Sequence, residues 1–97
     1  MKIDSHTHTI YSGHCLTKLQ DFRKICLKRD IFPIITDHNT VEGAIKYKKM
    51  YKDCIIGEEI STKQGELIGL FLNEKIEPGL DVYETVDKIK RQDGLVL

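Results

Sequence analysis

The hydrophobic and polar positions of this chain follow two alternating periods. Short apolar or β-branched runs, typical of strands, are separated by segments in which apolar residues recur every three or four positions, as in amphipathic helices. The predicted order is strand, helix, strand, helix, strand, strand, helix, strand. Strands are expected at 2–8, 33–36, 54–56, 66–72 and 95–97, and helices at 17–29, from 39 or 40 onward, and from 81 to the residues before 94.

Start and stop signals support the first and third predicted helices. Thr17 with Gln20 and Asp81 with Glu84 have the spacing of capping boxes, and Gly94 stands where a helix is expected to end. Each helix also has an apolar stripe that is expected to face the core. The stripe residues are Leu19, Phe22, Ile25 and Cys26 in the first helix, Val41, Ala44, Ile45 and Tyr51 in the second, and Val82, Val86 and Ile89 in the third.

Alternation of strands and helices predicts an α/β fold with a mostly parallel sheet, interrupted by a hairpin that turns at 63–65. Functional residues of such folds lie at the C-terminal ends of the strands. A closed barrel of this kind typically needs about 250 residues, whereas the chain has 97 and ends in the apolar run 95–97. Residues 1–97 are therefore expected to form a single domain truncated at its C-terminal end. Its open sheet edges predict marginal stability or self-association.

Composition narrows the class of protein. Hydrophobic residues make up 40% and charged residues 31% of the chain, and the formal net charge is zero. This balance argues against a nucleic-acid binder, and the lysines at 46–52 are interpreted as a solvated helix face. Three cysteines without a Cys-x-x-Cys pair indicate a reducing compartment, and the apolar runs are too short for a membrane helix. Since the N-terminus turns polar at once, without a signal peptide, we expect a cytoplasmic protein.

All four histidines fall within the first 38 residues. His6 and His8 end the first predicted strand, His14 follows in a Ser-Gly loop, and His38 comes directly after the second strand. Neutral imidazoles that converge from several elements are typical of a metal centre. Taken alone, an isolated His-x-His pair or His14 would more often lie on a surface loop, and His38 is equally compatible with a structural role. Asp37, the candidate catalytic residue, is interpreted as a ligand or as a group that orients an imidazole.

The third strand also ends in candidate ligands. Glu58 and Glu59 follow an apolar run, and a buried carboxylate is costly unless it is paired or bound to a metal. An exposed pair in a loop is the alternative for these two residues on their own. Together, however, the first three strands each end in residues that can bind a metal, and this coincidence favours a shared site.

These residues resemble the polymerase and histidinol phosphatase (PHP) family of metal-dependent phosphoesterases. The resemblance covers nearly the whole chain, and its motifs are specific only when they are taken together. It consists of three motifs: DSHTHT at 4–9 with YSGH at 11–14, ITDHNT at 35–40 with EG at 42–43, and GEEIS at 57–61 with GEL at 65–67.

The resemblance implies a distorted barrel of seven β/α units with two or three divalent metal ions, for which zinc, manganese or iron are suitable. It implies that His6 and His8 bind one ion, that Glu59 bridges to a second, and that His14 and His38 hold a third. Glu59 is preferred to Glu58 because it fits the Gly-x-Glu pattern. The implied reaction is attack of a metal-bound hydroxide on a small phosphomonoester substrate.

The chain departs from the family because no histidine follows position 38, where relatives carry further ligands. We therefore expect weak or absent phosphatase activity from the chain alone. A catalytically silent metal-binding module that serves binding or assembly is the alternative function. The branch of the family attached to DNA polymerases is disfavoured by the neutral charge, and an amidohydrolase-like barrel by the second and third motifs. Cys15, beside His14, is interpreted as a bystander, while Cys26 and Cys54 are expected in the core.

Overall fold

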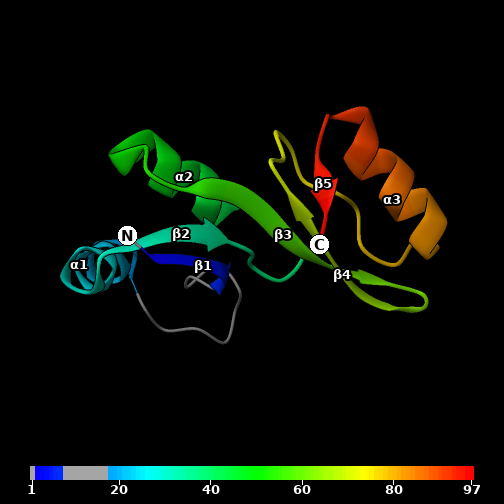
Figure 1. Ribbon diagram of the computed structural model, residues 1–97. Coiled ribbons are helices and arrows are strands. Elements are labelled where there is room, and N and C mark those ends of the chain that lie inside the picture. The colour runs from blue at the N-terminus through cyan, green and yellow to red at the C-terminus, as the bar shows by residue number, and fades with distance from the viewer. Residues whose placement is uncertain (1, 8–17) are drawn as a thin grey trace.

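The computed structural model describes residues 2–7 and 18–97, with the backbone alone for Lys2, Asp4, Ser5 and His6. The described residues form five strands and three helices in the predicted order (Figure 1). The elements are β1 (Lys2–Thr7), α1 (Leu19–Arg29), β2 (Ile31–Ile35), α2 (Glu42–Tyr51), β3 (Ile55–Thr62), β4 (Gly65–Leu70), α3 (Val82–Arg91) and β5 (Leu95–Val96).

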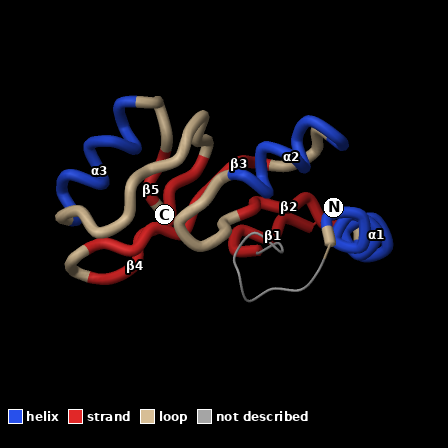
Figure 2. Tube along the Cα trace, turned by 180° about the vertical axis from the view of Figure 1, so that it is seen from behind, coloured by secondary structure: helices blue, strands red, loops and turns tan. Residues whose placement is uncertain are grey.

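The strands form one sheet in the sequence order β1-β2-β3-β4-β5, drawn in red in Figure 2. β1 pairs with β2 and β2 with β3 in parallel, whereas β3 with β4 and β4 with β5 are antiparallel. The prediction of a mostly parallel sheet was therefore wrong, and the sheet is mixed. The predicted hairpin is observed between β3 and β4. The unexpected pair is β4 with β5, which is antiparallel and leaves the sheet with as many antiparallel as parallel pairs.

One apolar cluster joins α1 and α2 to the sheet. Its buried members are Ile35, Ala44, Tyr47 and Cys54, with Phe22 packed edge-on against the Tyr47 ring at a centroid distance of 5.6 Å. The predicted core positions of Cys26 and Cys54 are confirmed. Ile25, predicted to face the core, is exposed, because α1 covers the sheet with a narrower stripe than the sequence pattern suggested.

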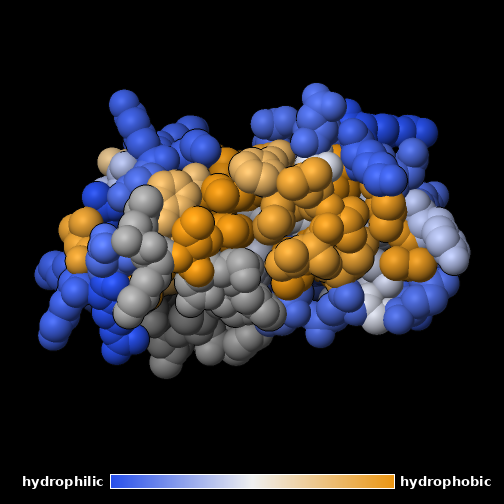
Figure 3. Space-filling model, in the orientation of Figure 1, coloured by the Kyte–Doolittle hydropathy of each residue, from blue (hydrophilic) through white to orange (hydrophobic). Residues whose placement is uncertain are grey.

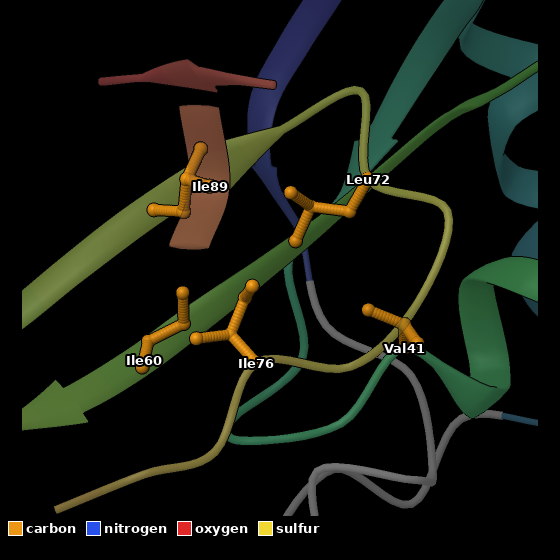
Figure 4. Close-up of a cluster of buried hydrophobic side chains, with 5 residues drawn as sticks. All are labelled: Val41, Ile60, Leu72, Ile76 and Ile89. Carbon is orange, nitrogen blue, oxygen red and sulfur yellow. The ribbon is translucent and has the colours of Figure 1, made fainter. Parts of the chain in front are cut away.

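A second apolar cluster lies under α3 (Figure 4). It consists of Val41, Ile60, Leu72, Ile76 and Ile89. Ile56 packs against both clusters, and Ile60 lies four residues further along β3, on the same face of the strand. The buried sides of the three described helices therefore cover one face of the sheet.

The start of α3 agrees with the sequence prediction, whereas its end differs from it. Asp81 is the N-cap, as predicted, and its side chain accepts a hydrogen bond from the Tyr83 N–H at 2.9 Å. The helix ends at Arg91 with Gln92 as its C-cap, before the predicted Gly94, and Asp93 takes the left-handed conformation. Gly94 closes this turn by donating its N–H to the Ile89 carbonyl at 2.9 Å. The predicted cap at Thr17 lies outside the described residues, and α1 begins after Lys18.

Apolar side chains reach the surface near the β5 edge of the sheet. Leu95, Val96 and Leu97 are exposed, as is Phe71, and Figure 3 shows a band of apolar residues across the middle of one side of the molecule. The described part of the chain is thus an α/β fold with a mixed five-stranded sheet, bounded by β1 at one edge and β5 at the other. None of its helices is long and apolar enough to cross a membrane.

Candidate metal centre

The C-terminal ends of the three parallel strands lie next to one another. Thr7 at the end of β1 accepts a hydrogen bond from the Thr36 N–H at 2.8 Å, which joins it to the segment after β2. That segment continues to His38, which forms an isolated parallel bridge with Glu59 of β3. His6 immediately precedes Thr7 in β1, while His8 and His14 lie outside the described residues. His38 follows the end of β2, as predicted. Glu59 was predicted at the end of a strand, but it lies inside β3, which continues to Thr62 because it pairs with β4.

Backbone bonds hold the segment that carries His38. The Glu59 N–H donates to the Asp37 carbonyl, and the Asn39 N–H donates to the Glu59 carbonyl, both at 2.9 Å. These two bonds lie on either side of His38 and extend the parallel pairing beyond the end of β2. As a result, the His38 backbone is held directly beside Glu59.

The Asn39 side chain also holds the segment around His38 against β3. Its side-chain oxygen accepts from the Ser61 N–H at 2.8 Å, and its amide nitrogen donates to the Ser61 hydroxyl at 3.2 Å. Asn39 has φ of 54°, in the left-handed region, which asparagine tolerates better than most residues. The residue thus turns the chain after His38 while tying the turn to β3.

Three side chains from three segments meet at this point. The His38 Nδ1 lies 3.4 Å from the Glu59 Oε1 and 3.4 Å from the Glu66 Oε2. Glu59 is nearly buried, His38 is partly exposed, and about half of the Glu66 side chain is open to solvent. The group therefore lies at the surface of the sheet, with Glu59 at its bottom and Glu66 at its rim.

The geometry of this group fits a divalent cation. One donor atom from each of His38, Glu59 and Glu66 lies within 4.8 Å of the other two. Around a tetrahedral ion with bonds of about 2.0–2.1 Å, neighbouring ligand atoms are about 3.3 Å apart, close to the two observed separations of 3.4 Å. One imidazole and two carboxylates are a donor set that suits zinc, manganese or iron.

Glu58 belongs to the opposite face of β3. Its side chain is fully buried, and its Oε1 accepts a hydrogen bond from the Ile76 N–H at 2.8 Å. The other oxygen, Oε2, is buried without a hydrogen-bond partner among the described residues. Burial raises the pKa of the Glu58 carboxyl to about 7, because an apolar environment disfavours the charged form. Glu58 therefore lies in the core, away from the His38 group.

Asp37, the candidate catalytic residue, is also buried, with 1% of its surface exposed. Its carbonyl oxygen holds the Glu59 N–H, as described above. The backbone of Asp37 therefore holds Glu59 in place, and Asp37 directly precedes His38 in the chain. Asp37 thus helps to position both candidate ligands.

Two residues of this site were not predicted to belong to it. Glu66 is part of the third motif, and Asn39 is part of the second motif and a predicted helix start, but neither was assigned to the metal centre. The alternation of Glu66, Ile68 and Leu70 along β4 is a signal that Glu66 shares a face with its apolar neighbours. The pairing of Ser61 with Glu66 and of Glu59 with Ile68 shows that Glu66 lies on the same face of the sheet as Glu59. This register depends on the length of the turn between β3 and β4.

Comparison with known proteins identifies two similar proteins from Methanocaldococcus jannaschii. Uncharacterized protein MJ1587 is 42% identical over 112 aligned residues, which cover 100% of this chain and 66% of that protein. Uncharacterized protein MJ0417 is 43% identical over 96 residues, which cover 99% of this chain and 38% of that protein. The chain thus spans less than two thirds of the length of either relative. No model of a known protein family matches the chain.

Proposed function

We propose that the chain carries the metal centre of a PHP-type phosphoesterase, which hydrolyses small phosphomonoesters. The observation that supports this most is the meeting of His38 and Glu59 at 3.4 Å. The two residues come from separate motifs of the resemblance and are 21 positions apart in the sequence. A barrel of the PHP type is part of the same proposal, supported by three adjacent parallel strands and helices on one face of the sheet.

The residues of the chain would have distinct roles in this reaction. A bound divalent cation would supply Lewis acidity toward a phosphoryl oxygen and lower the pKa of water. The resemblance assigns His38 and Glu59 to different ions, whereas their contact at 3.4 Å favours one shared cation. His6, His8 and His14 would be further ligands of a centre of two or three ions. Asp37 would keep Glu59 in place through the hydrogen bond to its backbone N–H. The partly exposed His38 side would leave room for a phosphate group.

The experiment that tests this proposal is hydrolysis of p-nitrophenyl phosphate by the purified chain with manganese or zinc, over a long incubation at high protein concentration. We expect slow release of product that is abolished in Glu59→Gln and retained in Glu58→Gln. Because Glu58 adjoins Glu59 but faces the core, the second variant controls for general damage to β3. Equal rates in the two variants, or a rate independent of metal, would contradict the proposal.

A catalytically silent metal-binding module is the second candidate function. The group of His38, Glu59 and Glu66 supports it as well, because three donor atoms can hold a cation without any catalysis. Stoichiometric metal binding, lost in Glu59→Gln, together with no hydrolysis of phosphomonoesters would replace the first proposal with this one.

A further inference from the structure

The geometry points to Glu66 as a ligand of the same cation as His38 and Glu59, so that the hairpin strand β4 contributes to the metal centre. This inference rests on the proposed function and extends it, since neither the strand ends nor the motif roles in the resemblance assign Glu66 to a metal. With Glu66, the described residues alone supply three protein donors. Three donors plus an open position are the usual arrangement of a catalytic zinc site.

The register of the hairpin places Glu66 correctly. Glu59 lies opposite Ile68, and Glu66 is two residues from Ile68 on β4, so that Glu59 and Glu66 are diagonal neighbours on one face. Diagonal pairs have Cα atoms about 7–8 Å apart, within reach of long side chains. A two-residue turn sets this register, and the Thr62 hydroxyl fastens it by donating to the Gly65 carbonyl at 2.6 Å and accepting from the Gln64 N–H at 3.2 Å.

The distances between His38 and the two carboxylates favour a metal site over a group held by hydrogen bonds. Both carboxylates approach the same nitrogen, His38 Nδ1, and both separations of 3.4 Å exceed the 2.7–3.2 Å range of N–H···O hydrogen bonds. One N–H can point at only one acceptor, whereas one cation can hold all three atoms. The two separations are close to the ligand spacing around a small cation, about 3.3 Å.

Charge supports the same inference. Glu59 and Glu66 bring two negative charges to one point of the sheet, and like charges on neighbouring strands repel each other. A divalent cation would neutralise both charges and leave His38 as a neutral donor. The half-exposed Glu66 at the rim would then let the ion enter from solvent, while Glu59 below it remains fixed by the pairing of β3.

The test is titration of the metal-free chain with Mn²⁺ and with Zn²⁺ by calorimetry, for the wild type, Glu66→Gln and His38→Ala. We expect Glu66→Gln to weaken binding by about tenfold or more, as loss of groups that support a metal typically does. Glu84→Gln, at an exposed glutamate of α3, is the matched control and should bind as the wild type does. Unchanged affinity in Glu66→Gln would overturn the inference.

The same variants separate this inference from the proposed function. If His38→Ala loses the ion and Glu66→Gln keeps it at full affinity, Glu66 is no ligand but the centre stands. If neither change affects binding, the proposed centre itself is wrong.

Thermal unfolding of the metal-free proteins distinguishes a metal ligand from a residue that only forms an ion pair with His38. If Glu66 is a metal ligand, its negative charge repels that of Glu59 when no metal is bound. The metal-free Glu66→Gln variant should then be at least as stable as the metal-free wild type. As an ion-pair partner of His38, Glu66 would instead stabilise the metal-free fold. In that case Glu66→Gln would lower the melting temperature, and the inference would fail.

Discussion

The two faces of β3 place adjacent glutamates in opposite environments. Glu58 points into the apolar cluster under α3, where Ile76 supplies its one hydrogen bond and burial raises its pKa to about 7. Glu59 points to the other face, where it meets His38 and Glu66. The same side chain is thus a core residue at one position and a candidate ligand at the next. Strand alternation, rather than residue type, therefore decides which of the two carboxylates can bind a cation.

The largest expected effect is on the core side of this comparison. Glu58→Ala removes the acceptor of the Ile76 N–H and leaves a cavity, so we expect the free energy of unfolding to fall by about 3 kcal/mol. Denaturant unfolding of the metal-free chain at pH 5 measures it, with Glu74→Ala as an exposed control that should change stability by less than about 0.5 kcal/mol. A similar small change in both variants would mean that Glu58 is not part of the core.

Gly57 lies on the same face of β3 as Glu59, at a position with no room for a side chain. A Cβ atom at this position would lie 2.8 Å from the Gly69 carbonyl oxygen and 2.9 Å from the Thr36 Cγ2. We expect Gly57→Ala to destabilise the fold by about 2–3 kcal/mol, because backbone of the neighbouring strand must move. An unfolding free energy within experimental error of the wild type would show that β3 and β4 are not packed this closely.

The pH dependence of stability tests the environment of Glu58. Its folded-state pKa, about 7, is above the ordinary value of 4.5. Between these values the folded state binds the proton and the unfolded state does not. The contribution of Glu58 is therefore largest below pH 4.5 and is lost as pH rises through 7.

Glu58→Gln removes this titration and keeps an oxygen acceptor for the Ile76 N–H. Relative to the wild type, we expect the variant to gain on the order of 2 kcal/mol between pH 5 and pH 8. The comparison uses unfolding in the presence of a chelator. A difference that is constant with pH would place the Glu58 carboxylate in solvent.

The smallest expected effect on stability concerns the turn that carries His38. Asn39→Gly keeps the left-handed conformation but removes both hydrogen bonds to Ser61, so we expect a loss of about 1 kcal/mol. The same variant should weaken metal binding, since His38 is no longer held beside Glu59. Unfolding and metal titration check the two effects, and full retention of affinity would show that Asn39 does not position His38.

The order of the elements was predictable because each local signal agrees with the final fold. The α3 cap at Asp81 and the buried cysteines followed from capping chemistry and apolar spacing. Tyr47 was missed as a core residue, because its buried position depends on how α1 crosses α2. The antiparallel hairpin of β3 and β4 was predicted, but the antiparallel pairing of β4 with β5 was missed because a whole helix separates these two strands.

The candidate centre was predictable only where strand ends determine it. His38 follows the apolar run of β2 directly, so its place after that strand could be predicted from the sequence. Glu59 was placed at a strand end, but it lies inside β3, which continues to Thr62. Glu66 follows a turn rather than a strand, and its proximity to Glu59 depends on the hairpin register. A shift of one residue would turn Glu66 to the other face. The contribution of Asn39 likewise depends on a positive φ that the sequence pattern does not specify.

The most direct test of the two-face account is the metal content of Glu58→Gln and Glu59→Gln after saturation with Mn²⁺ and removal of excess ion. Elemental analysis of both variants beside the wild type gives the ratio of metal to protein. We expect that Glu58→Gln keeps the wild-type metal content and that Glu59→Gln loses at least one ion. Loss of metal in Glu58→Gln with full retention in Glu59→Gln would contradict it, because the candidate ligand would then lie on the face covered by α3.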